Sequence, residues 1–539
     1  MDSMDTAERR PKRTRKAVEA TAAEMLTYRE EKEMRLAIEK SMEEIQAPVG
    51  LSAIEAPTFR PSLKEFSNPI AYIVSIRDQV ASNGGIAKIV PPEGWACPFD
   101  LDKSGLNIET KEQTVNKLGE GVPYGTGAEY NFDTYKAMAE AFRDRWVRKL
   151  VERGEDPDDY KAWERAYWRI VEGGEDEDVV VEYGNDVSTE VLGGGFPKLL
   201  GDDSEEDDER SGGKEEMWIG RPDFTNNEYY ARTEWNLSNI AWARKSVLGN
   251  IKDLINGINV PWLYFGMTFA TFSWHVEDNW LYSINYHHHG HPKLWYGLGP
   301  EYQHRFKQVL KQMMPIRFRE QPDLLSDITT MVNPTWLLNR NIQVHTILQQ
   351  PGEFVITLPG AYHGGFSLGF NVGEAVNFAP IDWITPGRLC RDVYRSESRP
   401  PVIAHDKVVW GLVNYSAEFT KPELELLIKE LHILVKSEQD MRSHAARDGV
   451  SFTVIMPPED SSSDESDLRR ACVKCNQPCS LHAVVCNCSP DRTACGSHQR
   501  HTCSCPASKK ALVTWATIDQ LLGKIRKLEL EVKTRFGSS

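Results

Sequence analysis

The sequence predicts an α+β protein with a β-rich core, flanking helices and a small metal-stabilised domain near its end. Residues 228–390 are the densest apolar region, and their short β-rich segments are separated by Gly, Pro and Asn, which is typical of a β-sandwich or barrel. Apolar residues recur at helical spacing over 131–152, 159–172 and 420–446. Eight of the ten cysteines lie between Cys472 and Cys505.

Length and composition limit the classes of protein that fit. A chain of 539 residues suggests about three to four domains. The 40% hydrophobic content and the 15 Trp, 18 Tyr and 19 Phe indicate sizeable buried cores. The formal net charge of −16 disfavours strong intrinsic DNA binding, since phosphate binding needs a basic surface, but it suits a basic partner such as a histone tail.

The sequence also indicates a cellular setting. No stretch approaches the roughly 20 apolar residues of a membrane span, and the first residues lack an apolar signal-peptide core. We therefore expect no membrane association and a soluble, intracellular protein. In that setting the cysteines are expected to be thiols or metal ligands rather than disulfides.

Charged segments surround the predicted domains. Residues 1–50 are expected to form a disordered or helical tail. The basic run from Arg9 to Lys16 is either a nuclear-localisation signal or a solvated tail. Residues 33–41 resemble a ubiquitin-interacting motif, which would make ubiquitin a partner, but a plain charged helix explains the same pattern. An acidic surface loop is expected at 201–214 and an acidic linker at 459–470.

Local signals predict individual elements. Residues 86–90 and 179–183 read as strands. Thr420 can cap a helix with Glu423 three residues on, and a last helix is expected to begin near Thr517. The expected buried stripes of these two helices are Leu424, Leu427, Ile428 and Leu431, and Ile518, Leu521, Leu522, Ile525 and Leu528.

A His-x-Glu pair is the first chemical signal. His275 and Glu277 lie in a strand-like segment, where side chains two residues apart point to the same face. One imidazole and one carboxylate are two-thirds of the facial triad of non-haem Fe(II) oxygenases, which leaves coordination positions open. The pair alone is a weak signal, and a distant second histidine must complete the site.

Two longer segments make the interpretation specific. Residues 261–297 read PWLYFGMTFATFSWHVEDNWLYSINYHHHGHPKLWYG, and residues 352–380 read GEFVITLPGAYHGGFSLGFNVGEAVNFAP. Both closely resemble the JmjC domain of histone lysine demethylases. The resemblance implies a double-stranded β-helix, or jelly-roll, and gives His363 as the third iron ligand. Residues 55–99 resemble the JmjN domain, which packs against JmjC in this family.

The same resemblance implies further roles. Lys293 and Tyr183 would bind the far carboxylate of 2-oxoglutarate, Ser283 and Asn285 would be polar groups around it, and Phe272 and Trp295 would wall its pocket. Tyr264 would border the methyl-lysine, and Asn377 would be a supporting amide grouped with the substrate-binding residues. The stretch His287-His288-His289 with His291 is not expected to bind metal. Related domains usually have an apolar or aromatic residue and an acid there, so its role stays open.

The cysteine cluster predicts two structural zinc ions, because two tetrahedral sites need eight ligands. Spacing suggests that the pairs with two intervening residues share one zinc and the pairs with one intervening residue share the other. The first set is Cys472, Cys475, Cys495 and His498, and the second is Cys486, Cys488, Cys503 and Cys505. Cys479 would be a buried thiol. The segment resembles the Cys/His zinc finger that follows JmjC in one demethylase branch.

The order JmjN, JmjC and zinc finger resembles the branch that acts on lysine 4 of histone H3. It implies oxidative demethylation of tri- or dimethyl-lysine with Fe(II), 2-oxoglutarate and O₂ in the nucleus, with the histone H3 tail or nucleosome and chromatin complexes as partners. Another histone lysine, protein hydroxylation and a non-enzymatic chromatin scaffold are the alternatives. The expected domains are JmjN at 55–99, a helical linker at 100–178, JmjC at 179–395, a helical segment at 396–458, a zinc finger at 471–507 and a C-terminal helix at 508–539.

Overall fold

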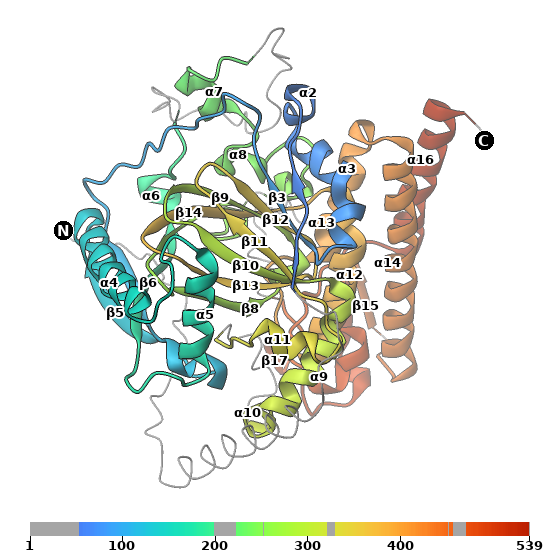
Figure 1. The fold of residues 1–539 in the computed structure, drawn as a ribbon. Helices are drawn as coiled ribbons and strands as arrows, with labels where there is room; N and C mark the ends of the chain where they lie inside the picture. Colours follow the sequence, from blue (N-terminus) through green and yellow to red (C-terminus); the bar gives the residue numbers. More distant parts are fainter. Residues whose placement is uncertain are drawn as a thin grey trace, which may run out of the picture.

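A jelly-roll built from two β-sheets lies at the centre of the molecule (Figure 1). The computed structural model describes residues 53–198, 222–251, 253–320, 329–450, 452–455 and 470–537. The tail at 1–50, with its basic run and ubiquitin-type motif, lies outside these residues, as do the acidic loop at 201–214 and the acidic linker except for its last residue.

The smaller sheet has five strands and the larger has nine. In spatial order the smaller sheet contains β1 (Ile54–Glu55), β11 (His345–Gln349), β10 (Lys293–Leu298), β13 (Tyr362–Ser367) and β8 (Thr271–His275). The larger contains β2 (Thr58–Phe59), β3 (Ile86–Ile89), β12 (Phe354–Thr357), β9 (Tyr282–Gly290), β14 (Asn371–Phe378), β7 (Trp262–Gly266), β6 (Val180–Ser188), β4 (Ile108–Thr114) and β5 (Gly125–Tyr130).

Side-chain alternation along the strands separates a cavity from the packed core. On β10, Lys293 lines a cavity whereas Leu294 is buried in a hydrophobic cluster. On β7, Tyr264 lines the cavity whereas Leu263 is buried in the same hydrophobic cluster. Because successive residues of a strand point to opposite faces, each sheet contributes one face to the cavity and one to a core covered by helices.

The N-terminal segment completes both sheets. Strand β1 pairs in parallel with β11 of the smaller sheet, and β3 pairs with β12 of the larger. Helices α2 (Leu63–Phe66) and α3 (Pro69–Ala81) connect them, and α3 buries Ile70, Ile73 and Val80. The strand expected at 86–90 is confirmed, and this region packs against the barrel as the JmjN resemblance implies.

The region 100–178 differs from the predicted helical linker. It contains α4 (Phe132–Glu152) and α5 (Tyr160–Val171), as expected, but also β4, β5 and η1 (Val115–Glu120). Strand β4 pairs with β6, so this region extends the large sheet. Strands β4 and β5 were not predicted because their sequences, IETKEQT and GTGAEY, are polar, and β5 is largely exposed.

Two long helices lie side by side at the C-terminal end of the molecule (Figure 1). They are α14 (Lys421–Arg447) and α16 (Ile518–Phe536). The predicted cap is confirmed, since the backbone N–H of Thr420 donates to Glu423 over 2.7 Å. Both stripes face the shared core, where Leu424, Leu427, Leu431, Leu521, Ile525 and Leu528 are buried and Ile428, Ile518 and Leu522 are partly buried. Within the described residues, no helix is long and apolar enough to cross a membrane.

The Cys-rich segment and the residues on either side of it form a separate sheet, in the order β15 (Phe452–Ile455), β18 (Ala511–Thr514), β16 (His482–Cys486) and β17 (Ser489–Ala494). Strand β18 lies beyond the expected end of the finger at residue 507, so the folded unit is longer than predicted. His482 anchors it to α14, because its Nδ1 lies 2.8 Å from the Glu438 carboxylate.

The remaining helices and 3₁₀ turns connect these layers. They are α6 (Thr189–Leu192), α7 (Asn227–Arg232), α8 (Leu237–Ile240), η2 (Val247–Asn250), η3 (Asp278–Trp280), η4 (Pro300–Tyr302), α9 (Gln303–Met313), α10 (Pro315–Glu320), α11 (Pro334–Leu338), η6 (Ile381–Trp383), α12 (Ile384–Glu397), α13 (His405–Gly411), η7 (Leu412–Glu418), η8 (Gly496–His501) and η9 (Ala507–Lys509).

Candidate metal centre and cosubstrate pocket

Three side chains from two separated segments meet at one end of the small sheet. His275 is the last residue of β8 and lies directly opposite His363 on β13, with ring centroids 4.2 Å apart. Glu277 follows two residues after β8, in extended backbone at the start of η3 rather than within the strand. One ligand atom from each of these residues lies within 4.8 Å of the others.

Hydrogen bonds orient all three groups. The Nδ1 atom of His275 lies 2.8 Å from the Ser273 carbonyl, and that of His363 lies 3.1 Å from the Ala361 carbonyl. These contacts favour the tautomer that carries its proton on Nδ1, which leaves both Nε2 lone pairs for a metal. The Asn377 amide donates to Glu277 Oε2 over 3.0 Å, so Asn377 supports a ligand, and it also lines the cavity.

The protonation states suit a divalent cation. Burial and the neighbouring His363 lower the pKa of His275 to about 4. Burial alone would raise the pKa of Glu277, but the contacts with His363, His275 and the Asn377 amide outweigh it and lower that pKa to about 2. At neutral pH the His275 imidazole is therefore neutral and the Glu277 carboxylate is ionised. This donor set fits Fe(II), which takes such a triad and keeps other positions open.

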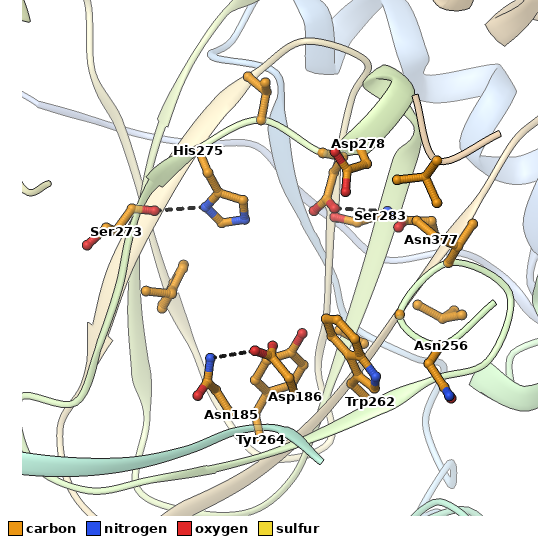
Figure 2. Close-up of a pocket in the computed structure, with 18 of the residues that line it drawn as sticks. Asn185, Asp186, Asn256, Trp262, Tyr264, Ser273, His275, Asp278, Ser283 and Asn377 are labelled. Atoms are coloured by element: carbon orange, nitrogen blue, oxygen red, sulfur yellow. Dashed lines mark hydrogen bonds between the residues drawn. The ribbon is translucent and has the colours of Figure 1, made fainter. Parts of the chain in front are cut away.

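The triad borders a large cavity between the sheets (Figure 2), with a volume of about 1670 Å³. Figure 2 shows His275 and Ser273 on one side of it and Tyr264, Asn185 and Asp186 on another. Typical small-molecule pockets occupy roughly 300–1,000 Å³. The cavity therefore has room for a substrate side chain beside a small cosubstrate.

Lys293 contributes a buried ammonium to this cavity. Its Nζ lies 5.8 Å from the ring centroid of Tyr264 and 5.7 Å from that of Phe272. Burial lowers its pKa to about 8, and no carboxylate of the described residues pairs with it. Burial also raises the pKa values of Tyr183 and Tyr264, so their hydroxyls remain hydrogen-bond donors. An anion with several acceptor oxygens would match these groups.

The remaining predicted residues also line the cavity. Phe272 and Trp295 form an edge-to-face pair with centroids 4.6 Å apart, which makes one wall. The Ser283 hydroxyl lies 2.6 Å from that of Thr357, and Asn285 faces the cavity from the same strand. The structure thus brings together all eight residues that the resemblance grouped around cosubstrate and substrate.

Two further contributions were not predicted. The Tyr124 hydroxyl lies 2.7 Å from Ser273 Oγ, next to the residue whose carbonyl orients His275. Asp278, which follows the ligand Glu277, accepts from Arg399 over 2.8 Å. No sequence signal marks either contact, since each joins residues more than a hundred positions apart.

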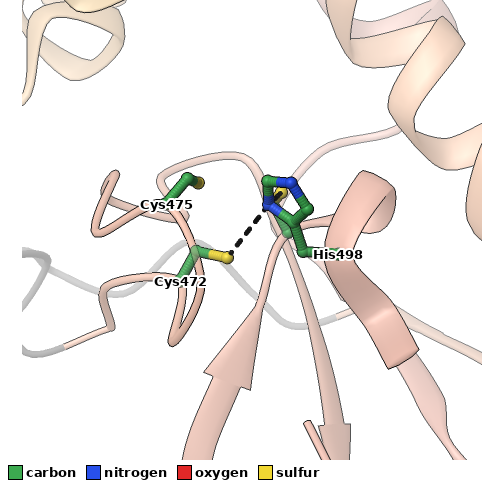
Figure 3. Close-up of side chains that lie close together, drawn as sticks. Cys472, Cys475 and His498 are labelled. Carbon is green, nitrogen blue, oxygen red and sulfur yellow. Dashed lines mark hydrogen bonds between the residues drawn. The ribbon is translucent and has the colours of Figure 1, made fainter. Parts of the chain in front are cut away.

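The Cys-rich sheet carries two four-ligand clusters. In the first, Cys472, Cys475 and His498 converge (Figure 3), and Cys495 Sγ lies 3.3 Å from His498 Nδ1. The second contains Cys486, Cys488, Cys503 and Cys505. In each cluster the four ligand atoms lie within 4.8 Å of one another, in the grouping that spacing predicts. Cys479 is buried outside both, and its pKa is raised well above the usual value by burial and by the nearby Cys472 and Cys475.

The first cluster contacts the wall of the cavity. Asn476, which follows Cys475, donates to the Ser398 carbonyl over 2.6 Å, and Gln477 donates to the Arg399 carbonyl over 2.8 Å. Arg399 in turn pairs with Asp278. A short chain of contacts therefore links a Cys cluster to the residue beside Glu277.

The His-rich stretch does not form a metal site among the residues described. His288 is fully buried, and its Nε2 lies 2.9 Å from a Glu374 carboxylate oxygen that also accepts from the Gly195 N–H. His289 is exposed, and His291 lies 3.8 Å from Glu140. These residues stand outside the three groups whose ligand atoms converge.

Comparison with known families agrees with this architecture. Residues 262–378 match the model of the JmjC domain, hydroxylase, residues 57–91 match the jmjN domain and residues 472–523 match the C5HC2 zinc finger. The eight clustered ligands follow the order of five Cys, one His and two Cys only if Cys479 is left out. The match also extends past residue 507 and includes β18.

The sequences of three curated relatives align with most of this chain. Lysine-specific demethylase 5B of Gallus gallus is 34% identical over 446 residues, which are 83% of this chain and 27% of the relative. Lysine-specific demethylase JMJ703 of Oryza sativa subsp. japonica is 31% identical over 527 residues, or 87% and 40% of the two chains. Lysine-specific demethylase JMJ17 of Arabidopsis thaliana is 37% identical over 368 residues, or 68% and 29%. The chain spans less than half the length of these relatives.

Proposed function

We propose that this chain, which belongs to the JmjC-domain proteins that also carry a JmjN domain and a C5HC2 zinc finger, is an Fe(II)- and 2-oxoglutarate-dependent lysine demethylase. One observation carries the proposal. Two imidazoles and a carboxylate converge, with one ligand atom of each within 4.8 Å of the others, and they border a cavity that contains a buried ammonium.

The residues around the cavity would have three different binding roles. His275, Glu277 and His363 would hold the iron, while Asn377 keeps the Glu277 carboxylate in place. Lys293 and Tyr183 would bind the far carboxylate of 2-oxoglutarate against the wall formed by Phe272 and Trp295. Tyr264 would border a methylated ammonium, which keeps its charge and favours an aromatic face.

Iron supplies oxidative chemistry when it is bound: O₂ and 2-oxoglutarate are converted to succinate and CO₂, and an N-methyl group leaves as formaldehyde. The protein's own residues position the reactants and keep the cavity sheltered. Oxidation of an N-methyl group needs no lone pair on the nitrogen, so trimethyl-lysine is an accessible substrate.

The substrate we propose is lysine 4 of histone H3, in its tri- or dimethyl form, in the nucleus. The order JmjN, JmjC and zinc finger supports this choice, and the net charge of −16 favours a basic histone tail. The relatives' names go no further than lysine-specific demethylase. We further propose that each Cys cluster binds one structural zinc, because four converging protein ligands close a tetrahedral site.

A peptide panel tests both levels of the proposal. The protein is incubated with Fe(II), 2-oxoglutarate, O₂ and histone H3 peptides trimethylated at single lysines, and products are read by mass spectrometry. Demethylation removes about 14 Da per methyl group, whereas stable hydroxylation adds about 16 Da. We expect mass loss on the lysine 4 peptide and none with the His275→Ala variant.

The other outcomes separate the alternatives. Mass loss on a different peptide would overturn the lysine 4 assignment but keep the demethylase. A gain of about 16 Da would make the protein a hydroxylase. No turnover on any peptide, with no iron bound, would favour a non-enzymatic scaffold.

A further inference from the structure

Another histidine, His287, lies beside the buried Lys293 ammonium. His287 is on β9 and is only 1% exposed, yet neither of its ring nitrogens has a hydrogen-bond partner. A neutral imidazole carries one donor and one acceptor nitrogen. Buried polar groups nearly always find partners, so this side chain is expected to have one in the working protein.

The sheet register gives His287 the same orientation as the cavity-lining residues of β9, although His287 itself is not part of the lining. Ser283 and Asn285 line the cavity, and His287 continues the same alternation along β9. Across the sheet, Gly373 of β14 pairs with His287 on one side and with Tyr264 of β7 on the other. Residues directly opposite in an antiparallel pair share a face, so His287 lies on the same face as Tyr264. Figure 2 shows Tyr264 and Ser283 at this cavity.

Gly373 creates the space between these two rings. A Cβ atom added at Gly373 would lie 3.5 Å from Lys293 Nζ. The ammonium therefore lies over the one position in this row that lacks a side chain, with the Tyr264 ring 5.8 Å away and His287 on the other flank. Lys293 and His287 are close enough to interact electrostatically, and this interaction adds to burial in lowering the pKa of His287.

We propose that His287 is a third binding residue for the far carboxylate of the 2-oxo acid, beside Lys293 and Tyr183, and that it donates a ring N–H to the anion that Lys293 holds. This inference rests on the proposed function and deepens it. A neutral imidazole can supply an N–H to a carboxylate without placing a second positive charge beside Lys293. A single bound carboxylate would thus pair with both the Lys293 ammonium and the His287 imidazole.

Two ligands that differ only at the far end isolate this contact. 2-Oxoglutarate carries the second carboxylate, whereas 2-oxopentanoate has the same chain length and ends in a methyl group. Binding of each is measured by calorimetry to Ni(II)-loaded wild-type protein and to the His287→Leu and His287→Gln variants. The matched control is His289→Leu, which changes an exposed histidine two residues along the same strand.

We expect His287→Leu to weaken 2-oxoglutarate binding about tenfold or more, the effect of one hydrogen bond to a charged group. It should leave 2-oxopentanoate binding unchanged, and His287→Gln should restore part of the loss. Equal weakening of both ligands would show a packing role and overturn the inference, as would unchanged 2-oxoglutarate binding. If wild-type protein binds no 2-oxoglutarate, the proposed function itself fails.

Discussion

The barrel triad and the Cys clusters use overlapping ligand types in two different ways. Each Cys cluster brings four protein ligands together, which fills a tetrahedral site. The triad brings only three together and borders a cavity of about 1670 Å³. The difference is in coordination number: the clusters leave no position for a reactant, whereas the triad leaves several. One region should therefore serve folding and the other chemistry.

Removing a triad ligand is the strongest test of this division. We expect His363→Ala to lower turnover at least about a thousandfold and to abolish iron binding, because two ligands cannot hold the metal. The measurements are succinate formation, iron content and thermal unfolding. The fold should change little, since the ring lies at the border of a cavity; a collapse of Tm without selective loss of iron would contradict the division.

Removing a ligand from a Cys cluster should have the opposite signature. Cys475→Ser should lower folding stability by about 4 kcal/mol, because structural zinc contributes folding free energy. Cys475 is buried and its neighbours contact Ser398 and Arg399, whereas Cys488 is exposed, so Cys488→Ser should cost less. Zinc content and thermal unfolding measure both variants. Equal losses of Tm would show that burial does not distinguish the clusters.

These two regions also differ in how far sequence reasoning reaches. Ligand spacing led to the grouping of Cys495 with Cys472, because all eight ligands lie within 34 consecutive residues, 472–505. His363 lies 88 positions from His275 and came only from resemblance. Tyr124 could not be found in either way, because it reaches Ser273 from the irregular segment directly before β5, which no hydrophobic pattern marks. Local spacing predicts local chelates, and long-range contacts require the fold.

The two regions should respond to pH in opposite directions. The pKa of Lys293 is lowered to about 8, so its ammonium is present below that pH and is lost as the pH rises. Affinity for 2-oxoglutarate should therefore fall about tenfold per pH unit above the pKa. The Cys clusters should instead lose zinc as the pH falls, since only thiolates bind the metal. Calorimetry across pH 6–10 tests the first effect. The Lys293→Met variant should bind 2-oxoglutarate weakly, with an affinity that does not change over that range.

The groups behind the ligands should matter less than the ligands themselves. Asn377→Ala removes the amide that donates to Glu277, and we expect about a tenfold loss of iron affinity with the fold intact. Asn285→Ala is the matched control, because Asn285 lines the cavity without a side-chain hydrogen bond to the triad. Equal effects of the two variants on metal binding would remove the orienting role from Asn377.

The smallest effect should come from the contact that joins the two regions. Gln477 is buried and donates to the Arg399 carbonyl, and Arg399 pairs with Asp278 beside Glu277. Gln477→Ala should cost about 1 kcal/mol, the net value of one hydrogen bond. Lys474→Ala, an exposed change in the same loop, is the control. In Gln477→Ala we expect faster amide exchange around residues 398–403 with zinc content unchanged. The Cys cluster keeps all its ligands, but its hydrogen bond to the cavity wall is lost. Unchanged exchange would mean that the finger and the barrel, although in contact, are energetically independent.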